Sequence, residues 1–172
     1  MSVRDVVDLA RGGSIASPAV VAARPIRALL LLGLLLPAAA VRGEDLSSQA
    51  LTTRAWDALA AGDLPAALAA TTKCRELYAA DADRQQGELD DFLPAEKGHD
   101  AWALNDVGTC LFIEGQAHEK AGRTAEAQAA YRRLVADSRF AQCWDQKGWF
   151  WKPAQAATDR LEVLEFDKAL DR

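Results

Sequence analysis

Residues 61–71, AGDLPAALAAT, and residues 121–131, AGRTAEAQAAY, are two copies of one pattern, and this pattern decides the fold. Both copies begin with Ala-Gly and share alanines at their seventh, ninth and tenth positions. Glycine readily ends a helix because it adopts the left-handed conformation, and small alanines let a second helix approach closely. Each copy therefore predicts a helix, a tight turn and a second helix, repeated at an offset of 60 residues.

Apolar residues at helical spacing extend on both sides of each turn. Asp63 is suited to cap a helix, and Pro65 falls in its first turn, where a missing N–H costs nothing. No stretch alternates in the way that predicts strands. The expected helices cover residues 48–61, 64–80, 100–121, 124–137 and 153–170.

We therefore expect an all-α domain over residues 44–172. It would contain two antiparallel helix pairs and a C-terminal capping helix. The expected segments are the pairs at about 48–80 and 100–138, a Trp-rich segment at 140–152 and the capping helix at 153–170. Between the pairs, residues 81–98 are acidic and interrupted by glycine and proline, which predicts a frayed helix end and a connecting loop.

The second copy of the pattern resembles the tetratricopeptide repeat, a 34-residue antiparallel helix pair with small residues near its turn. The matching residues are Gly115, Gly122, Ala127 and Tyr131. The first copy matches at Ala55, Gly62, Ala67 and Cys74, with Thr71 where the family has an aromatic residue. The offset of 60 residues and the lack of proline after Asp137 depart from the family, so the resemblance implies the helix-pair unit rather than a regular superhelical solenoid.

Two further stretches, LNDVGTC at 104–110 and AQCWDQKGWFWKPA at 141–154, are similar to short exported bacterial proteins of the tetratricopeptide type. Some of those proteins are labelled β-glucanase precursors. The resemblance implies a secreted helical protein. In tetratricopeptide proteins the first helix of each pair lines a binding groove, which here implies contacts from Thr52, Trp56, Thr109, Phe112, Gln116 and Glu119. Trp56 and Phe112 fit a place in the core equally well.

Residues 24–43, RPIRALLLLGLLLPAAAVRG, have the layout of a secretory signal. Arg24 and Arg27 precede an apolar run of 14 residues, which is shorter than the roughly 20 that a membrane-spanning helix needs. Small residues for cleavage stand at Ala38 and Ala40, or at Val41 and Gly43. We expect residues 1–43 to be an extension and signal peptide, with translation starting near Val20 or Val21, and the rest to be periplasmic or secreted without a membrane span.

The charge of the expected mature chain limits its partners. The whole chain has a net charge of −5, and residues 1–43 hold five basic and two acidic residues, so residues 44–172 carry −8. Such a balance repels nucleic-acid phosphates and anionic lipids, and neither is expected as a partner.

Three of the five tryptophans lie in the Trp-rich segment, at Trp144, Trp149 and Trp151. Two helix pairs cannot bury their own apolar faces, and a terminal unit usually covers the last one. We therefore expect these indoles, with Phe150, to cover the fourth helix and anchor the fifth. The alternative is a surface on which a sugar or peptide stacks.

The cysteines Cys74, Cys110 and Cys143 match no zinc spacing, and no metal or cofactor is expected. In an oxidising compartment one disulfide would form, for which Cys110 with Cys143 is a candidate. Pairing of Cys74 with Cys110, or three packed thiols, remain alternatives.

A catalytic constellation is not recognisable in the sequence. The acidic motif of sandwich-fold glucanases, Glu-x-Asp-x-x-Glu, is approached only at Glu165 and Asp167, with Leu170 in the third acidic position. We therefore expect a protein- or peptide-interaction module without enzymatic activity. The alternative is a carbohydrate- or envelope-associated protein, linked to β-glucan metabolism, that uses the tryptophan cluster.

Overall fold

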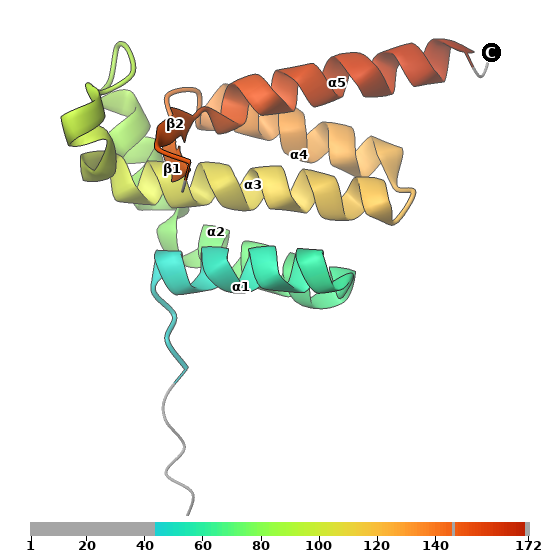
Figure 1. The fold of residues 1–172 in the computed structure, drawn as a ribbon, viewed down its shortest axis with the longest axis horizontal. Helices are drawn as coiled ribbons and strands as arrows, with labels where there is room; N and C mark the ends of the chain where they lie inside the picture. The colour runs from blue at the N-terminus through green and yellow to red at the C-terminus, as the bar shows by residue number, and fades with distance from the viewer. Residues whose placement is uncertain (1–43, 146, 171–172) are drawn as a thin grey trace, which may run out of the picture. The chain divides into compact units, whose positions relative to one another are not determined.

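Helices make up most of residues 44–145 and 147–170, the residues that the computed structural model describes (Figure 1). The all-helical class is confirmed in its broad form. The elements are α1 (Ser48–Ala61), α2 (Leu64–Gly87), the 3-10 helix η1 (Ala95–Ala101), α3 (Trp102–Lys120), α4 (Thr124–Asp137), β1 (Cys143–Asp145), β2 (Trp149–Trp151) and α5 (Pro153–Leu170). The expected signal segment lies outside the described residues. Among the described residues, no helix combines the length and apolar character needed to cross a bilayer.

Side-chain caps and glycines fix the start of α1 and the turns that follow α1 and α3. The Ser47 hydroxyl accepts a hydrogen bond from the backbone N–H of Ala50 and so caps the start of α1. Gly62 ends α1 with a φ of 77°, and Asp63 then caps α2 by accepting from the N–H of Ala66. Gly122 has a φ of 70° in the turn between α3 and α4. Both turns use the glycine that the sequence pattern placed there.

Helix α2 continues through Gly87, which corrects the expected frayed end from residue 81, and the connecting loop is confined to residues 88–94 before η1 begins. Arg84 forms ion pairs with Asp81 and Glu88 on the exposed face of this extra length. On its buried face, the side-chain oxygen of Gln85 accepts a 2.9 Å hydrogen bond from the backbone N–H of Leu104. Because Gln85 satisfies an N–H group in the first turn of α3, the end of α2 is fixed by a contact between distant residues.

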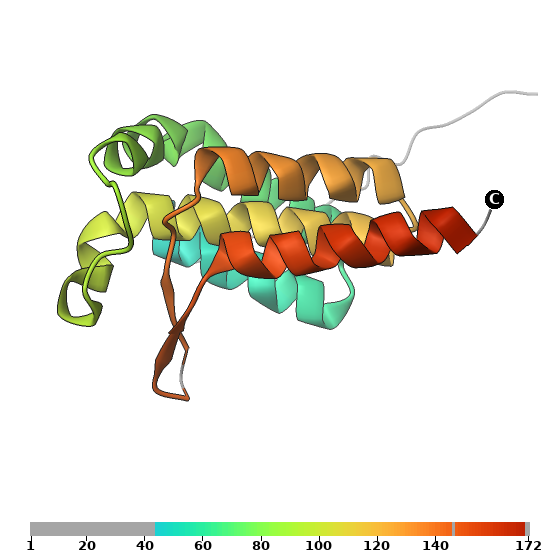
Figure 2. The same ribbon diagram turned by 90° about the horizontal axis from the view of Figure 1, so that it is seen from above.

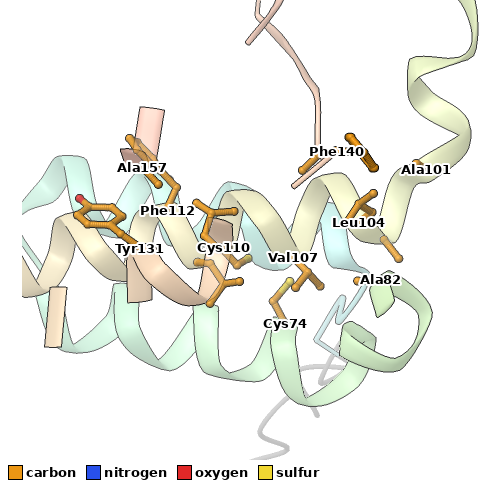
Figure 3. Close-up of a cluster of buried hydrophobic side chains, with 14 of the residues drawn as sticks. Cys74, Ala82, Ala101, Leu104, Val107, Cys110, Phe112, Tyr131, Phe140 and Ala157 are labelled. Carbon is orange, nitrogen blue, oxygen red and sulfur yellow. The ribbon is translucent and has the colours of Figure 1, made fainter. Parts of the chain in front are cut away.

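Helix α3 lies at the centre of the packing and contacts α1, α2, α4 and α5. Its side chains join those of the other helices in the largest hydrophobic cluster (Figure 3). Gly115 is essential to this packing, because a Cβ atom there would lie 2.2 Å from the Tyr131 ring of α4. Tyr131 is fully buried, and its hydroxyl donates a 2.5 Å hydrogen bond to Glu119. The helices α3 and α4 therefore approach closely where the sequence pairs a glycine with a tyrosine.

The Trp-rich segment forms an antiparallel β-hairpin, which corrects the expectation that the domain has no strands. Cys143 pairs with Trp151, Trp144 with Phe150 and Asp145 with Trp149. Figure 2 shows the hairpin extending away from the helices between α4 and α5. Gly148, with a φ of 93°, allows the tight turn, and aromatic side chains favour strands.

Candidate functional site

A cleft of about 680 Å³ opens between α1, α3 and the β-hairpin. This volume is in the range of ligand-binding sites. The lining residues are Ser47, Ser48, Gln49, Thr52, Trp56, Tyr78, His99, Trp102, Asn105, Asp106, Thr109, Gln142, Cys143, Trp144 and Trp151. Large aromatic side chains therefore share the cleft with hydroxyl, amide and carboxylate groups, and none of its described lining residues is a lysine or arginine.

A second hollow of about 420 Å³ shares part of this lining. We call it the tryptophan pocket, and its lining residues are Trp56, Trp144, Asp145, Trp149 and Trp151. Because Trp56, Trp144 and Trp151 line both cavities, the tryptophan pocket and the cleft have a common wall.

Residues from two separate sequence predictions lie together at this site. Thr52, Trp56 and Thr109, which the family resemblance implied for a groove, line the cleft. Trp144 and Trp151, which belonged to the alternative stacking surface, line it from the hairpin side. Trp149 completes the tryptophan pocket. Three of the six expected groove residues and the three tryptophans of the stacking surface therefore lie on adjoining surfaces.

The other three expected groove residues do not line the cleft. Phe112 is buried, with its ring centroid 6.4 Å from that of Trp56 and 5.3 Å from that of Trp151. It therefore supports two indoles of the site from within the core. Gln116 and Glu119 lie farther along α3, where they line a smaller hollow with Lys120 and Arg160.

The expectation that the indoles seal the end of the core is wrong for two of them. Trp144 is 53% exposed and Trp149 is 52% exposed. Trp151 is half-buried and packs against Phe112. Buried aromatic area stabilises a fold, so the exposed faces of Trp144 and Trp149 leave much of that stabilisation unused. These two side chains instead offer flat apolar faces to a ligand.

The hairpin is held beside α3 by contacts from Asn105 and Phe150. The Asn105 amide donates to the backbone carbonyl of Gly98 (2.7 Å), and its oxygen accepts from the N–H of Gln142 (2.8 Å). The Phe150 ring lies on Gly98, where a Cβ atom would approach it to 2.7 Å. One buried amide thus connects η1, α3 and the start of the hairpin, and it fixes the wall of the cleft.

Asp106 is the acidic group of the cleft, and sequence reasoning did not single it out. It is partly buried, and the Ser48 hydroxyl donates a 2.5 Å hydrogen bond to it. Burial raises the pKa of its carboxyl above the usual range, against the opposing effect of that hydrogen bond. Among the described residues, no ion pair involves Asp106. The sequence signal that could have found it is its place beside Asn105 in an otherwise apolar helix stripe.

The three cysteines are separate thiols, which agrees with the alternative of three packed thiols and not with the Cys110–Cys143 candidate disulfide. The sulfur of Cys110 lies 3.4 Å from the Thr52 hydroxyl of α1, whereas that of Cys143 lies 2.9 Å from the Thr109 hydroxyl. The two sulfurs thus engage different partners. Contact with Cys74, together with burial, raises the pKa of Cys110, and burial raises the pKa of Cys143 to about 12. These thiols are therefore protonated and weakly nucleophilic at neutral pH.

The described residues of the cleft and the tryptophan pocket offer aromatic faces, hydroxyl and amide groups, and carboxylates. Within the described residues, no group of three His, Cys, Asp or Glu side chains is arranged to hold a metal ion. In the part of the chain that the structure describes, Asp106 is the one carboxylate that lines the cleft, and Asp145 lines the tryptophan pocket. Comparison with known proteins found no matching family model, no matching curated protein and no matching solved structure. The function is therefore argued from the residues of the site.

Proposed function

We propose that this protein is a binding module of tetratricopeptide-like helix pairs that holds an extended peptide segment in the cleft. The observation that carries the proposal is the lining of one open cleft by α1, α3 and the β-hairpin. Helices α1 and α3 are the first helices of the two proposed pairs, and this is the surface that the family resemblance assigns to ligand contacts. Of the implied contacts, Thr52, Trp56 and Thr109 face this cleft.

The side chains of the cleft suit a peptide. An extended peptide needs partners for its backbone amides and flat or apolar surfaces for its side chains. Gln49 offers an exposed amide at the α1 edge, and Asp106 offers a carboxylate on the α3 side. The indoles of Trp56, Trp102 and Trp144 supply large contact area with few rotatable bonds, as in the energetic centres of many protein interfaces.

The proposal does not include catalysis. Glycoside hydrolysis by the usual routes needs two carboxyl groups flanking the scissile bond, about 5–9.5 Å apart. Asp106 is the only Asp or Glu among the described residues that line the cleft. Because no second carboxyl group lies beside it in the described lining, we assign Asp106, which accepts a hydrogen bond from Ser48, to binding rather than to glycoside hydrolysis.

Carbohydrate binding is the second candidate function. The half-exposed indoles of Trp144 and Trp149 favour it, because sugar rings stack on flat aromatic faces. In that case the protein would be associated with glycans or the cell envelope, with the tryptophan pocket as its contact surface.

Export to the periplasm or the medium is part of the proposal and rests on residues 24–43. Expression of the full chain in a Gram-negative host, followed by cell fractionation and N-terminal sequencing, tests it. A mature N-terminus within a few residues of Gly43 in the periplasmic fraction supports export. An uncleaved chain in the cytoplasm contradicts it.

The binding proposal is tested with the purified full chain and its own tryptophan fluorescence. A library of short peptides and a set of β-gluco-oligosaccharides are titrated in parallel. Trp144→Ala is expected to weaken peptide binding at least about tenfold, the usual effect of losing a central indole. Phe166→Ala is the matched control, because Phe166 is 64% exposed on α5 and does not line the cleft.

Three outcomes decide between the candidates. Peptide binding that depends on Trp144 and not on Phe166 supports the peptide module. Binding of oligosaccharides alone, with the same dependence, establishes the second candidate in its place. Binding of neither class, or equal losses in both variants, overturns the assignment of the cleft.

A further inference from the structure

The tryptophan pocket combines four indoles with one carboxylate. Trp56 comes from α1, while Trp144, Asp145, Trp149 and Trp151 come from the two strands of the hairpin. Tryptophan is the aromatic side chain that attracts cations most strongly, because its ring faces carry partial negative charge. A cation between indole faces and beside a carboxylate would be stabilised by both.

We propose that the tryptophan pocket receives a cationic side chain, lysine or arginine, of the bound peptide, an inference that rests on the proposed peptide-binding function. Asp145 is oriented for this role. Its Oδ1 accepts a 2.8 Å hydrogen bond from the backbone N–H of Lys147 in the hairpin turn, which fixes the carboxylate at the pocket edge. Among the described residues that line the pocket there is neither lysine nor arginine, so this lining supplies no cation of its own.

The nearest basic side chains in the sequence are engaged elsewhere or do not line the pocket. The ammonium nitrogen of Lys152 lies 3.7 Å from the ring centroid of Phe92. Lys147 is exposed in the turn and is not among the lining residues. The fold therefore already pairs one lysine with an aromatic ring and leaves the four indoles for an external cation.

The adjoining cleft strengthens the preference for positive charge. Asp106 lines it without an ion-pair partner among the described residues. The chain as a whole has a net charge of −5. A basic peptide would thus meet a carboxylate in each cavity and a favourable long-range field on approach.

A neutral sugar fits this pocket less well. Sugar hydroxyls need several hydrogen-bonding side chains around the stacked ring. Among the described residues of the pocket lining, Asp145 is the only such side chain besides the indole N–H groups. A purely apolar side chain would remove water from the Asp145 carboxylate and leave its charge without an opposite charge, which is costly. A cation satisfies the rings and the carboxylate together.

The test compares two pentapeptides with the full chain, acetyl-Ala-Lys-Ala-Lys-Ala-amide and its counterpart with norleucine in place of lysine. Norleucine keeps the aliphatic stem and lacks the ammonium group. We expect the lysine peptide to bind about tenfold more tightly by tryptophan fluorescence, and its affinity to fall as salt is raised. Tetramethylammonium chloride, titrated separately, probes the pocket without any peptide.

Variants show where the cation binds. Asp145→Asn keeps an oxygen that can accept from Lys147 N–H, so the hairpin should remain folded, yet it is expected to abolish the preference for lysine over norleucine. Trp149→Ala should weaken the response to tetramethylammonium at least about fivefold. Phe166→Ala should change neither measurement. Circular dichroism of each variant confirms that the fold is retained.

The outcomes separate this inference from the proposed function. Equal binding of the two pentapeptides, lost in Trp144→Ala, keeps the peptide function and overturns the cation site. A response to tetramethylammonium that needs Asp145, with no binding of any peptide, keeps the cation site and overturns the peptide function. If neither the pentapeptides nor tetramethylammonium binds, both are wrong.

Discussion

Replacing Gly115 with alanine tests the closest approach in the helical core. A Cβ atom at Gly115 would lie 2.2 Å from Cε1 of Tyr131, and 2.5 and 2.6 Å from two neighbouring ring atoms. The Tyr131 ring is not able to swing aside, because it is fully buried, contacts Phe112 at a centroid distance of 5.8 Å and is anchored through its hydroxyl to Glu119. Helices α3 and α4 must therefore move apart to admit the methyl group.

The size of the effect follows from this overlap. Carbon atoms in contact lie about 3.5–4.0 Å apart, so the new methyl group overlaps the ring by more than about 1 Å. Overpacking a core costs about 1–3 kcal/mol, and the fixed ring argues for the upper end. Against this cost, alanine stabilises a helix interior by up to about 1 kcal/mol relative to glycine. The expected net loss is about 2 kcal/mol of unfolding free energy, or about 8 °C in Tm for a domain of this size.

Chemical denaturation of the full chain and of Gly115→Ala measures this loss. Gly87→Ala is the matched control, because a Cβ atom at Gly87 meets nothing within 4 Å and its φ is not positive. It should leave stability unchanged or raise it slightly. Combining Gly115→Ala with Tyr131→Leu should cost less than the sum of the two single changes, since the smaller side chain vacates the ring's position. A Gly115→Ala protein as stable as the parent would refute the close contact between α3 and α4.

Three further predictions concern titratable groups. Asp106→Asn should have a higher free energy of unfolding than the parent at pH 7, because burial raises the pKa of the Asp106 carboxyl and makes its charged form costly in the folded protein. This cost vanishes as the pH falls through the raised pKa, so the denaturation curves of the two proteins should converge toward pH 4. Glu119→Gln should lower the free energy of unfolding by about 1 kcal/mol at pH 7, because hydrogen bonds from Arg160 and Tyr131 outweigh the effect of burial and lower the Glu119 pKa. The difference in stability from the parent should disappear as the pH falls below about 4. Thiol titration without reductant should find three slow-reacting thiols in the native chain, in line with the Cys143 pKa of about 12, and three fast-reacting thiols after unfolding. If only one thiol reacts after unfolding, the other two form a disulfide and the prediction is wrong.

Helix ends were predictable wherever a short-range signal fixes them. Ser47, Gly62 and Asp63 act on backbone groups within a few residues, so the caps can be identified without knowledge of tertiary contacts. Helix α1 accordingly spans the expected residues. The same holds at Pro153, where α5 begins with a residue whose missing N–H costs nothing at a helix start.

Helix α2 and the hairpin were mispredicted for different physical reasons. The last turns of α2 are held by Gln85, whose partner Leu104 is 19 residues away, so no local pattern reveals them. The strands are only three residues long, from Cys143 to Asp145 and from Trp149 to Trp151, and such short runs cannot display an alternating pattern. In addition, three consecutive aromatic residues are typical of a buried plug as much as of a strand.

The candidate site was predicted in parts but not as a whole. Trp56 and Trp144 each belonged to a predicted surface, yet nothing in the sequence indicated that these surfaces are adjacent. Their proximity depends on Asn105, which bonds Gly98 and Gln142, residues 44 positions apart in the chain. Asp106 escaped notice because a carboxylate in a helix is usually solvated, and only the tertiary structure shows that Ser48 and the helices around it bury this one.

The partly buried carboxylate and the exposed indoles of this site lower the stability of the unbound protein, and a bound ligand would remove that cost. Asp106 is partly desolvated without an ion-pair partner among the described residues, and Trp144 and Trp149 keep about half of their surface in water. Each can be replaced by a side chain that suits the isolated fold better, asparagine for the acid and a polar strand former for either indole. A basic peptide would neutralise the acid and cover the indoles at once, so the same groups that lower the stability of the unbound protein would contribute to affinity. Substitutions that raise the melting temperature while weakening binding should therefore concentrate along the common wall of the cleft and the tryptophan pocket.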